Sequence, residues 1–195
     1  MVIQNTVISF EQLVRDFDSL FRHRVFRLET LDWYDAPNEH EPYARFLAGK
    51  PADLAWREPW KRLVRDVRAS GRIMQRVHIV SEPISDYIRF ELLRVYPANV
   101  EAGEDVRILG RSSVMGMLTG NLFQGLLNAD FWLFDDRLVA FLAYTPDGSV
   151  EHVKLIEDGR FVRACMRHRE DALRDAIPLA EYVAQHDITE RKHAA

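Results

Sequence analysis

A dense set of polar side chains follows an apolar run at residues 81–89. The stretch RVHIVSEPISDYIRFELLRVY, residues 76–96, carries Ser81, Ser85, Asp86, Tyr87 and Arg89. The backbone N–H groups at a helix start can bind an anion. The same serines can instead cap the helix, and a carboxylate and a guanidinium at i, i+3 can form a surface pair. We therefore predict a helix start that first caps its own backbone and second holds a small anionic ligand.

A second group of candidate residues lies in EHVKLIED, residues 151–158. His152 and Lys154 resemble the His-x-Lys pair of phospholipase D-type phosphodiesterases, in which the His attacks phosphorus and the Lys stabilises the phosphoryl oxygens. The Asp of that motif should come one residue after Asp158. Alternation along a strand explains the pair equally simply, so we favour a solvent-facing strand and keep His152 and Lys154 as the alternative catalytic residues.

A better match in context is NADFWLFDD, residues 128–136, where FWLF is a buried strand of the right length. Aligning Asp135 with the Asp of the same motif places Asn128 at the His position and Asp130 at the Lys position. Asn is no nucleophile, and an Asp repels phosphate. This segment therefore predicts no catalytic residue, and Asp135 joins the predicted ligand-binding residues because it follows a neighbouring strand.

Other kinds of site are not predicted. None of the seven histidines has another at i+3 or i+4, and there is one cysteine, so we expect no metal site. Glycine-rich phosphate loops and a Gly-x-Ser-x-Gly elbow are missing, and we expect no cofactor. A basic group in residues 163–169 could bind phosphate, although a basic helix face explains it better; its members are Arg163, Arg167, His168 and Arg169.

The first seventy residues read as a helix–strand–helix segment. Ser9 and Gln12 form a capping box before a helix at 10–22, and alternation predicts a strand at 25–31. Pro42 and Pro59 can each open a helix, the second of which ends at Gly71.

From residue 72 the pattern changes to a strand at 72–80, a helix at 84–96 ended by Pro97, and a strand at 105–109. This unit predicts a right-handed parallel crossover. Residues 110–128 indicate a loose helix or a lid-like loop. Three antiparallel strands then follow, and a helix at 165–185 is expected to kink near Pro178. We predict a 1–70 segment packed on a core at 71–185, with a frayed tail at 186–195.

The composition favours an ordinary globular protein of the cytoplasm. Net charge is -4, which argues against a DNA-binding module. A single cysteine, Cys165, fits a reducing compartment, and no apolar run is long enough to span a membrane. Exposed strand edges would allow a homodimer.

Two resemblances rest on particular motifs. SEP-x-SDY-x-RFE and FWLFDD look like a family of uncharacterised actinobacterial proteins of the DUF6879 type, members of which are often encoded beside helix-turn-helix regulators. GEDVRIL, residues 103–109, followed by FWLFDD, is more distantly similar to the phospholipase D-like fold. The resemblance implies an α/β fold, an α/β/α sandwich around a mixed sheet. It departs from that fold's catalytic residues at Asn128 and Asp130.

Together these patterns predict a non-catalytic regulatory or binding protein. We expect it to work with a helix-turn-helix regulator or to sense a small anionic ligand at the carboxyl ends of its strands. The alternative is a phosphodiesterase, nuclease or toxin-like effector with an altered site.

Overall fold

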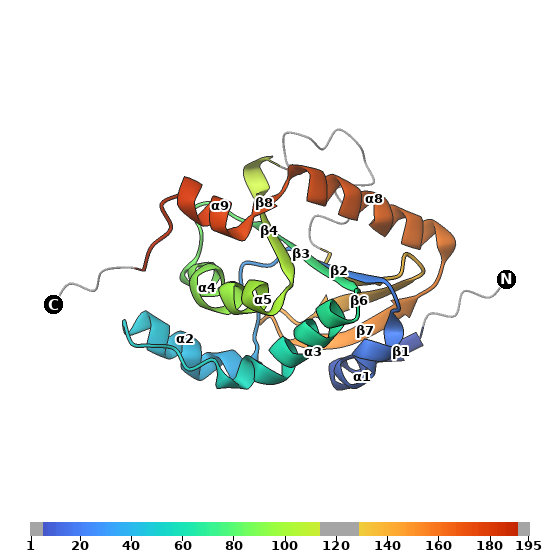
Figure 1. Cartoon of the computed structure of the whole chain (residues 1–195), viewed down its shortest axis with the longest axis horizontal. Coiled ribbons are helices and arrows are strands. Elements are labelled where there is room, and N and C mark those ends of the chain that lie inside the picture. The colour runs from blue at the N-terminus through green and yellow to red at the C-terminus, as the bar shows by residue number, and fades with distance from the viewer. Residues whose placement is uncertain (1–5, 114–128, 191–195) are drawn as a thin grey trace.

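In the computed structural model, residues 6–113 and 129–190 are described, and an eight-stranded mixed sheet lies between layers of helices (Figure 1). The strand order is β1-β7-β6-β5-β2-β3-β4-β8. The strands are β1 Thr6–Ile8, β2 Arg24–Glu29, β3 Ile73–Val80, β4 Asp105–Gly110, β5 Phe131–Phe134, β6 Leu138–Tyr144, β7 Val150–Ile156 and β8 Ile177–Pro178. The predicted α/β class, with helices on both faces of a mixed sheet, is confirmed.

Only the central strands are parallel among those described. β2 pairs in parallel with β3, and β3 with β4, whereas the remaining pairs are antiparallel. The predicted crossover from β3 to β4 and the three sequential antiparallel strands β5, β6 and β7 are therefore present. One sheet runs across residue 70, because β2 from the first segment pairs with β3 and β5. The division into 1–70 and 71–185 stays a prediction.

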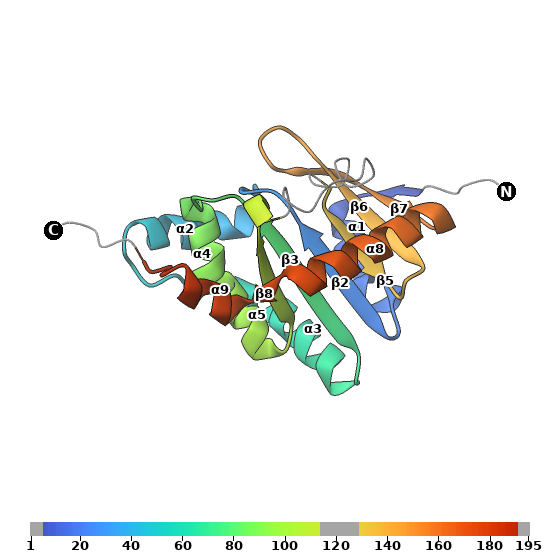
Figure 2. The same ribbon diagram turned by 90° about the horizontal axis from the view of Figure 1, so that it is seen from above.

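Helices cover the two faces unequally (Figure 2). α8 crosses one face, and α1, α3, α4 and α5 lie on the other. Their bounds are α1 Phe10–Asp16, α2 His40–Leu47, α3 Glu58–Ala69, α4 Asp86–Phe90, α5 Tyr96–Ala102, α8 Gly159–Asp175 and α9 Leu179–Gln185. Short 3₁₀ helices occupy Phe17–Leu20, Pro37–Glu39 and Ala55–Arg57, and a π-helical turn occupies Glu91–Val95.

Several helix ends differ from the prediction. The helix expected at 84–96 begins at Asp86 and passes through the π turn into α5, so Pro97 does not end it. Pro97 lies in the first turn of α5, directly after the π turn. α8 begins at Gly159 because the Asp158 side chain caps the N–H groups of residues 160 and 161, and β8 replaces the expected kink at Pro178.

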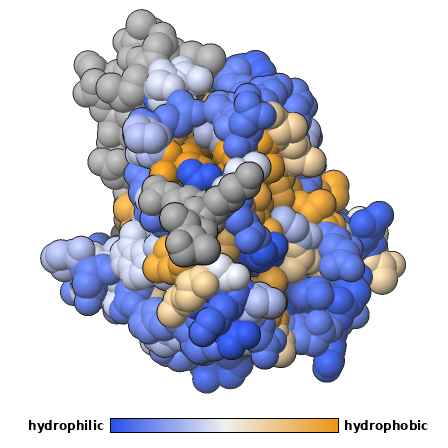
Figure 3. Space-filling view, turned by 90° about the vertical axis from the view of Figure 1, so that its left-hand side faces the viewer, coloured by the Kyte–Doolittle hydropathy of each residue, from blue (hydrophilic) through white to orange (hydrophobic). Residues whose placement is uncertain are grey.

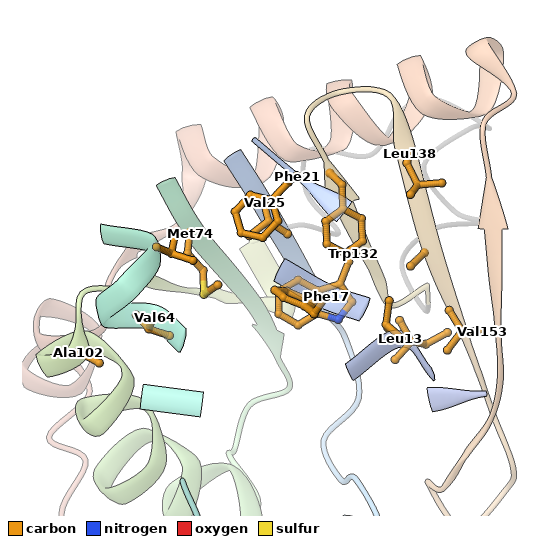
Figure 4. Packing of buried hydrophobic residues seen from close by; sticks show 14 residues of the cluster. Leu13, Phe17, Phe21, Val25, Val64, Met74, Ala102, Trp132, Leu138 and Val153 are labelled. Atoms are coloured by element: carbon orange, nitrogen blue, oxygen red, sulfur yellow. The ribbon is translucent and has the colours of Figure 1, made fainter. Parts of the chain in front are cut away.

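The sheet has apolar clusters on both faces. The cluster shown in Figure 4 joins α1 and α3 to β2, β3, β5 and β6 through residues such as Phe17, Val64 and Trp132. Val162 and Cys165 of α8 pack against the opposite face. A third cluster, around Phe90 and Tyr96, lies on the same face as the first but further along β3 and β4. Between these two clusters the same face carries polar groups.

Among the described residues, no helix combines the length and apolar character needed to cross a membrane. Figure 3 shows one side of the molecule, where hydrophobic residues gather toward the middle and hydrophilic residues dominate the periphery.

Candidate functional site

Charged side chains from β2, from β3 and from the residues just before β4 and β5 are buried beneath the helices. Alternation places Arg27 and Glu29 of β2 on the same face of the sheet as Val25, which belongs to the α1–α3 cluster. Arg76 of β3 lies beside them, because it pairs in register with Arg27. Glu104 precedes β4, and Asp130 precedes β5. We call these five residues the charged cluster: Arg27, Glu29, Arg76, Glu104 and Asp130, each at most 8% exposed.

Arginine–carboxylate pairs hold the cluster together. Arg76 Nη1 donates to Glu29 Oε2 at 2.7 Å, and Arg76 Nε donates to Glu104 Oε1 at 2.8 Å. Arg27 Nη2 donates to Asp130 Oδ2 at 3.1 Å. Burial alone would raise the pKa of Glu29, but the charges of Arg76 and Arg27 hold it well below its usual range. Each carboxylate of the cluster has a guanidinium in contact, which offsets part of the cost of removing it from water.

Asp130 is the most fully hydrogen-bonded carboxylate of the cluster. Its Oδ1 accepts from the Thr30 backbone N–H and hydroxyl, both at 2.8 Å. Its Oδ2 accepts from the hydroxyls of Tyr34 at 2.6 Å and Tyr144 at 3.0 Å. Asp130, which motif alignment placed at a lost catalytic position, therefore ties β2, β5, β6 and the loop after β2 together.

A hydrogen-bonded chain leads from Glu29 to the backbone. The Tyr96 hydroxyl donates to Glu29 Oε2 at 2.9 Å and lies 2.6 Å from His78 Nδ1. His78 Nε2 lies 2.8 Å from the Leu31 carbonyl, which can only accept, so the proton is assigned to Nε2. Burial lowers the pKa of His78 and favours the neutral ring.

A second buried group consists of two glutamates, which we call the carboxyl pair. Glu39 is 7% exposed and Glu91 is 6% exposed, and each carboxyl acts on the pKa of the other. Burial raises the pKa of both, the charge of Glu39 raises that of Glu91 further, and Arg57 opposes these shifts. The Tyr87 hydroxyl donates to Glu39 Oε2 at 2.6 Å. Glu91 belongs to the π turn, an irregularity found often at functional sites.

One cavity of about 440 Å³ is bordered by the carboxyl pair and by three members of the charged cluster, Arg27, Glu29 and Arg76. This size suits a small molecule. Its walls include the indoles of Trp56, Trp60 and Trp132, and the exposed side chains Phe10 and Val14 of α1 also border it. Five buried polar atoms of lining residues have no hydrogen-bond partner: Arg27 Nη1, Trp56 Nε1, Arg57 Nε, Trp60 Nε1 and Glu91 Oε1. Buried polar groups are normally hydrogen-bonded, so these atoms mark a place where a ligand can bind.

Of the residues predicted at the start of α4, one lines the cavity and the two serines make hydrogen bonds that hold the local structure. Tyr87 is the residue that lines the cavity. The Ser85 hydroxyl accepts from the Ile88 N–H at 3.1 Å and caps α4, as predicted. Ser81 accepts from Arg111 Nε at 3.0 Å, and its own N–H donates to Asp32.

The remaining predicted ligand-binding residues lie outside the cavity lining. Asp86 and Arg89 form the predicted i, i+3 pair at 3.9 Å, and Arg89 also donates to the Thr189 carbonyl. Asp135 lies in the β5–β6 turn, where its carboxylate accepts from the backbone N–H groups of Arg22, His23 and Arg24 at 2.6 to 2.9 Å. Its contacts anchor the start of β2.

The alternative catalytic residues lie on the other face of the sheet. His152 and Lys154 flank Val153 on β7, and Val153 packs in the α1–α3 cluster, so alternation turns both away from the cavity. Asn128 lies outside the described residues, as do residues 114–128 of the loose helix or lid-like loop predicted at 110–128. The basic group of α8 is split, since Arg163 and Arg167 are exposed whereas His168 and Arg169 are buried, with Arg169 paired to Asp136. Across residues 6–113 and 129–190 no cluster of His, Cys, Asp or Glu could hold a metal.

Sequence reasoning missed most of the site. Arg27 and Glu29 in VFRLE, and Arg76 and His78 in QRVHIV, are polar residues at alternate positions of otherwise apolar strands. This alternation places the charged side chains on a buried face of the sheet, and it was the sequence pattern from which the charged cluster could have been predicted. Glu39, Arg57 and Glu91 come from three separate helical turns, and no spacing in the sequence connects them.

The chain belongs to the family described as a domain of unknown function, DUF6879. The model of this family matches residues 9–184. This confirms the family resemblance. Among solved structures, NucT from Helicobacter pylori is similar, with 13% identity, a TM-score of 0.47, and coverage of 91% of this chain and 99% of that chain. A comparison with curated protein sequences gave no match.

Proposed function

We propose that this protein is a non-catalytic binding protein that holds a small molecule in the cavity between the charged cluster and the carboxyl pair. The supporting observation is the set of unpartnered buried atoms on its walls. Four of the five are donors, from two arginines and two tryptophans. The ligand therefore presents an acceptor-rich group, such as the carboxylate or phosphate of the small anion predicted from sequence.

The arrangement of the charged cluster favours binding over catalysis. Glu29 is held ionised by two arginines, and Asp130 accepts four further hydrogen bonds besides its pair with Arg27. Groups so fully engaged are poor proton acceptors or nucleophiles. We propose that occupancy of the cavity is read by a protein partner, with a helix-turn-helix regulator as the expected one.

Intrinsic tryptophan fluorescence tests the proposal directly, because three of the four tryptophans line the cavity. Titration with a library of small carboxylates and phosphates should give a saturable change for at least one compound. Trp60→Phe keeps an aromatic ring but removes the Nε1 donor, and should weaken that binding about tenfold, as for a lost hydrogen bond to a charged group. Absence of saturable binding across the library would reject a ligand role for this cavity.

The partner requires a separate experiment. We expect a helix-turn-helix regulator from the same cells to co-purify with this protein, and the bound fraction to change when the cavity ligand is added. If the same preparation instead hydrolyses a generic phosphodiester, and His152→Ala abolishes the turnover, the phosphodiesterase alternative replaces the binding function.

A further inference from the structure

The charged cluster, the carboxyl pair and Arg57 together contain more carboxyls than guanidiniums. Five carboxyl groups, Glu29, Glu39, Glu91, Glu104 and Asp130, accompany three guanidinium groups, Arg27, Arg57 and Arg76. The carboxylates with an arginine partner are Glu29, Glu104 and Asp130. The two carboxyls without an arginine ion pair are those of the carboxyl pair, and burial raises the pKa of both.

The unpartnered atoms on the cavity walls differ in character. Arg27 lies over the Trp132 ring at 5.2 Å, and the Trp60 ring centroid lies 5.8 Å from that of Trp132, so the unpartnered donors Arg27 Nη1 and Trp60 Nε1 belong to side chains that contact the same ring. On the carboxyl pair the unpartnered atom is the acceptor Glu91 Oε1, and Glu91 is 6% exposed. A ligand that satisfies both sets needs an acceptor group for Arg27 and Trp60 and a donor group for Glu91.

We propose that the cavity binds a zwitterionic amino acid or a close relative, whose carboxylate meets Arg27 and Trp60 and whose ammonium displaces the proton held by Glu39 and Glu91. This inference rests on the proposed function and assigns the ligand class. With both carboxyls ionised, two negative charges face the single positive charge of Arg57, and the ligand ammonium completes the neutralisation. The displaced proton passes to solvent.

Other charged and titratable groups act on the carboxyl pair from every side. They are Glu29 of β2, Arg57 of the 3₁₀ helix before α3, Arg76 of β3, and Tyr87 of α4. Arg57 and Arg76 favour the ionised form of Glu91, whereas Glu29 opposes it. Burial is the largest effect and favours the protonated form of both carboxyls. A cation in contact with the pair would favour the ionised form and release the proton.

The test compares each of the twenty standard amino acids with its N-acetyl derivative, which keeps the carboxylate but lacks the ammonium. Isothermal titration in two buffers of different ionisation enthalpy measures proton release on binding. We expect at least one amino acid to bind at least tenfold more tightly than its N-acetyl form and to release a proton. Equal binding of the two forms, or binding without proton release, overturns the inference but leaves the binding function intact.

Variants separate the contact with the ligand ammonium from the contact with its carboxylate. Glu91→Gln should weaken binding of the amino acid at least tenfold and abolish proton release, while leaving the N-acetyl form unaffected. Glu41→Gln is the matched control, because Glu41 is exposed on α2 and away from the cavity lining. Trp60→Phe should weaken both forms. If no amino acid binds while a library acid does, the ligand class is wrong; if neither set binds, the proposed function fails with it.

Discussion

At the scale of single residues, the stability of the fold depends on buried charges that are each paired with an opposite charge. Arg76 joins Glu29 to Glu104, and its guanidinium also lies over the Tyr96 and Trp132 rings. Removing one member of such a group leaves a buried charge without a partner, which costs far more than the intact pair contributes. The same residues therefore carry both the stability of the central strands and the walls of the cavity.

Arg76→Met should lower the free energy of unfolding by about 3–5 kcal/mol, because Glu29 and Glu104 lose their shared guanidinium. Chemical denaturation measures the change. Arg107→Met is the control, since its pair with Asp105 is about one-third exposed and should cost under about 1 kcal/mol. Similar losses for the two variants would show that the charged cluster is accessible to water.

Because of the carboxyl pair, we expect the free energy of unfolding to fall as the pH rises. The pKa of Glu39 and that of Glu91 are raised in the folded chain, so the folded state binds more protons than the unfolded state above pH 4.5. Their contribution is complete below that pH and is lost as the pH rises through the raised values. Denaturation at pH 5 to 8 should show this slope, and Glu91→Gln should flatten it. An unchanged slope in the variant would place the titrating groups elsewhere.

At the scale of elements, the strands were more predictable than the helix ends. Alternation and apolar runs located β2, β3, β4 and the three strands β5 to β7, because buried strands leave a strong local pattern. β1 and β8 were missed, since segments of three and two residues carry no periodicity and exist only through pairing with β7 and β4. The passage through Pro97 was missed because a π turn depends on tertiary packing.

The candidate site was predicted least well for the same reason. The residues at 81–89 lie together in the sequence, and local spacing correctly suggested the Ser85 cap and the Asp86–Arg89 pair. The cavity instead combines β2, β3, the π turn and a 3₁₀ turn, which are far apart in the chain. Only Tyr87 belongs to both groups. Chemistry assembled across elements leaves no spacing for a sequence to show.

Ser85→Ala tests the assignment of the α4 start as a cap. Loss of the hydroxyl that accepts from the Ile88 N–H should cost about 1 kcal/mol of unfolding free energy. Ser85→Asp should restore most of it, because Asp caps as well as Ser. Ligand affinity measured by tryptophan fluorescence should not change in either variant; a loss of affinity with unchanged stability would return Ser85 to the binding site.

At the scale of the whole molecule, the two faces of the sheet have different tasks. The face beneath α8 is packed with apolar side chains such as Phe26, Phe131 and Leu133, all at most 3% exposed. The other face interrupts its apolar clusters with the charged cluster and the cavity. Burial of apolar surface on the face beneath α8 stabilises the fold. The other face contributes less, because it carries buried polar atoms without hydrogen-bond partners.

The reactivity of Cys165 measures how often the apolar face beneath α8 opens. It is fully buried on α8, and burial raises the pKa of its thiol from 9.0 to about 12, which lowers the thiolate fraction near neutral pH about a thousandfold. Iodoacetamide labelling of the native protein should therefore be slower than that of the unfolded chain by at least this factor. Because the chain has one cysteine, mass spectrometry gives the rate without ambiguity. In a denaturant series the labelling rate should follow global unfolding, since α8 packs on the central strands. Rapid labelling that does not depend on denaturant would mean that α8 opens locally, and that the apolar face is not the stable half of the molecule.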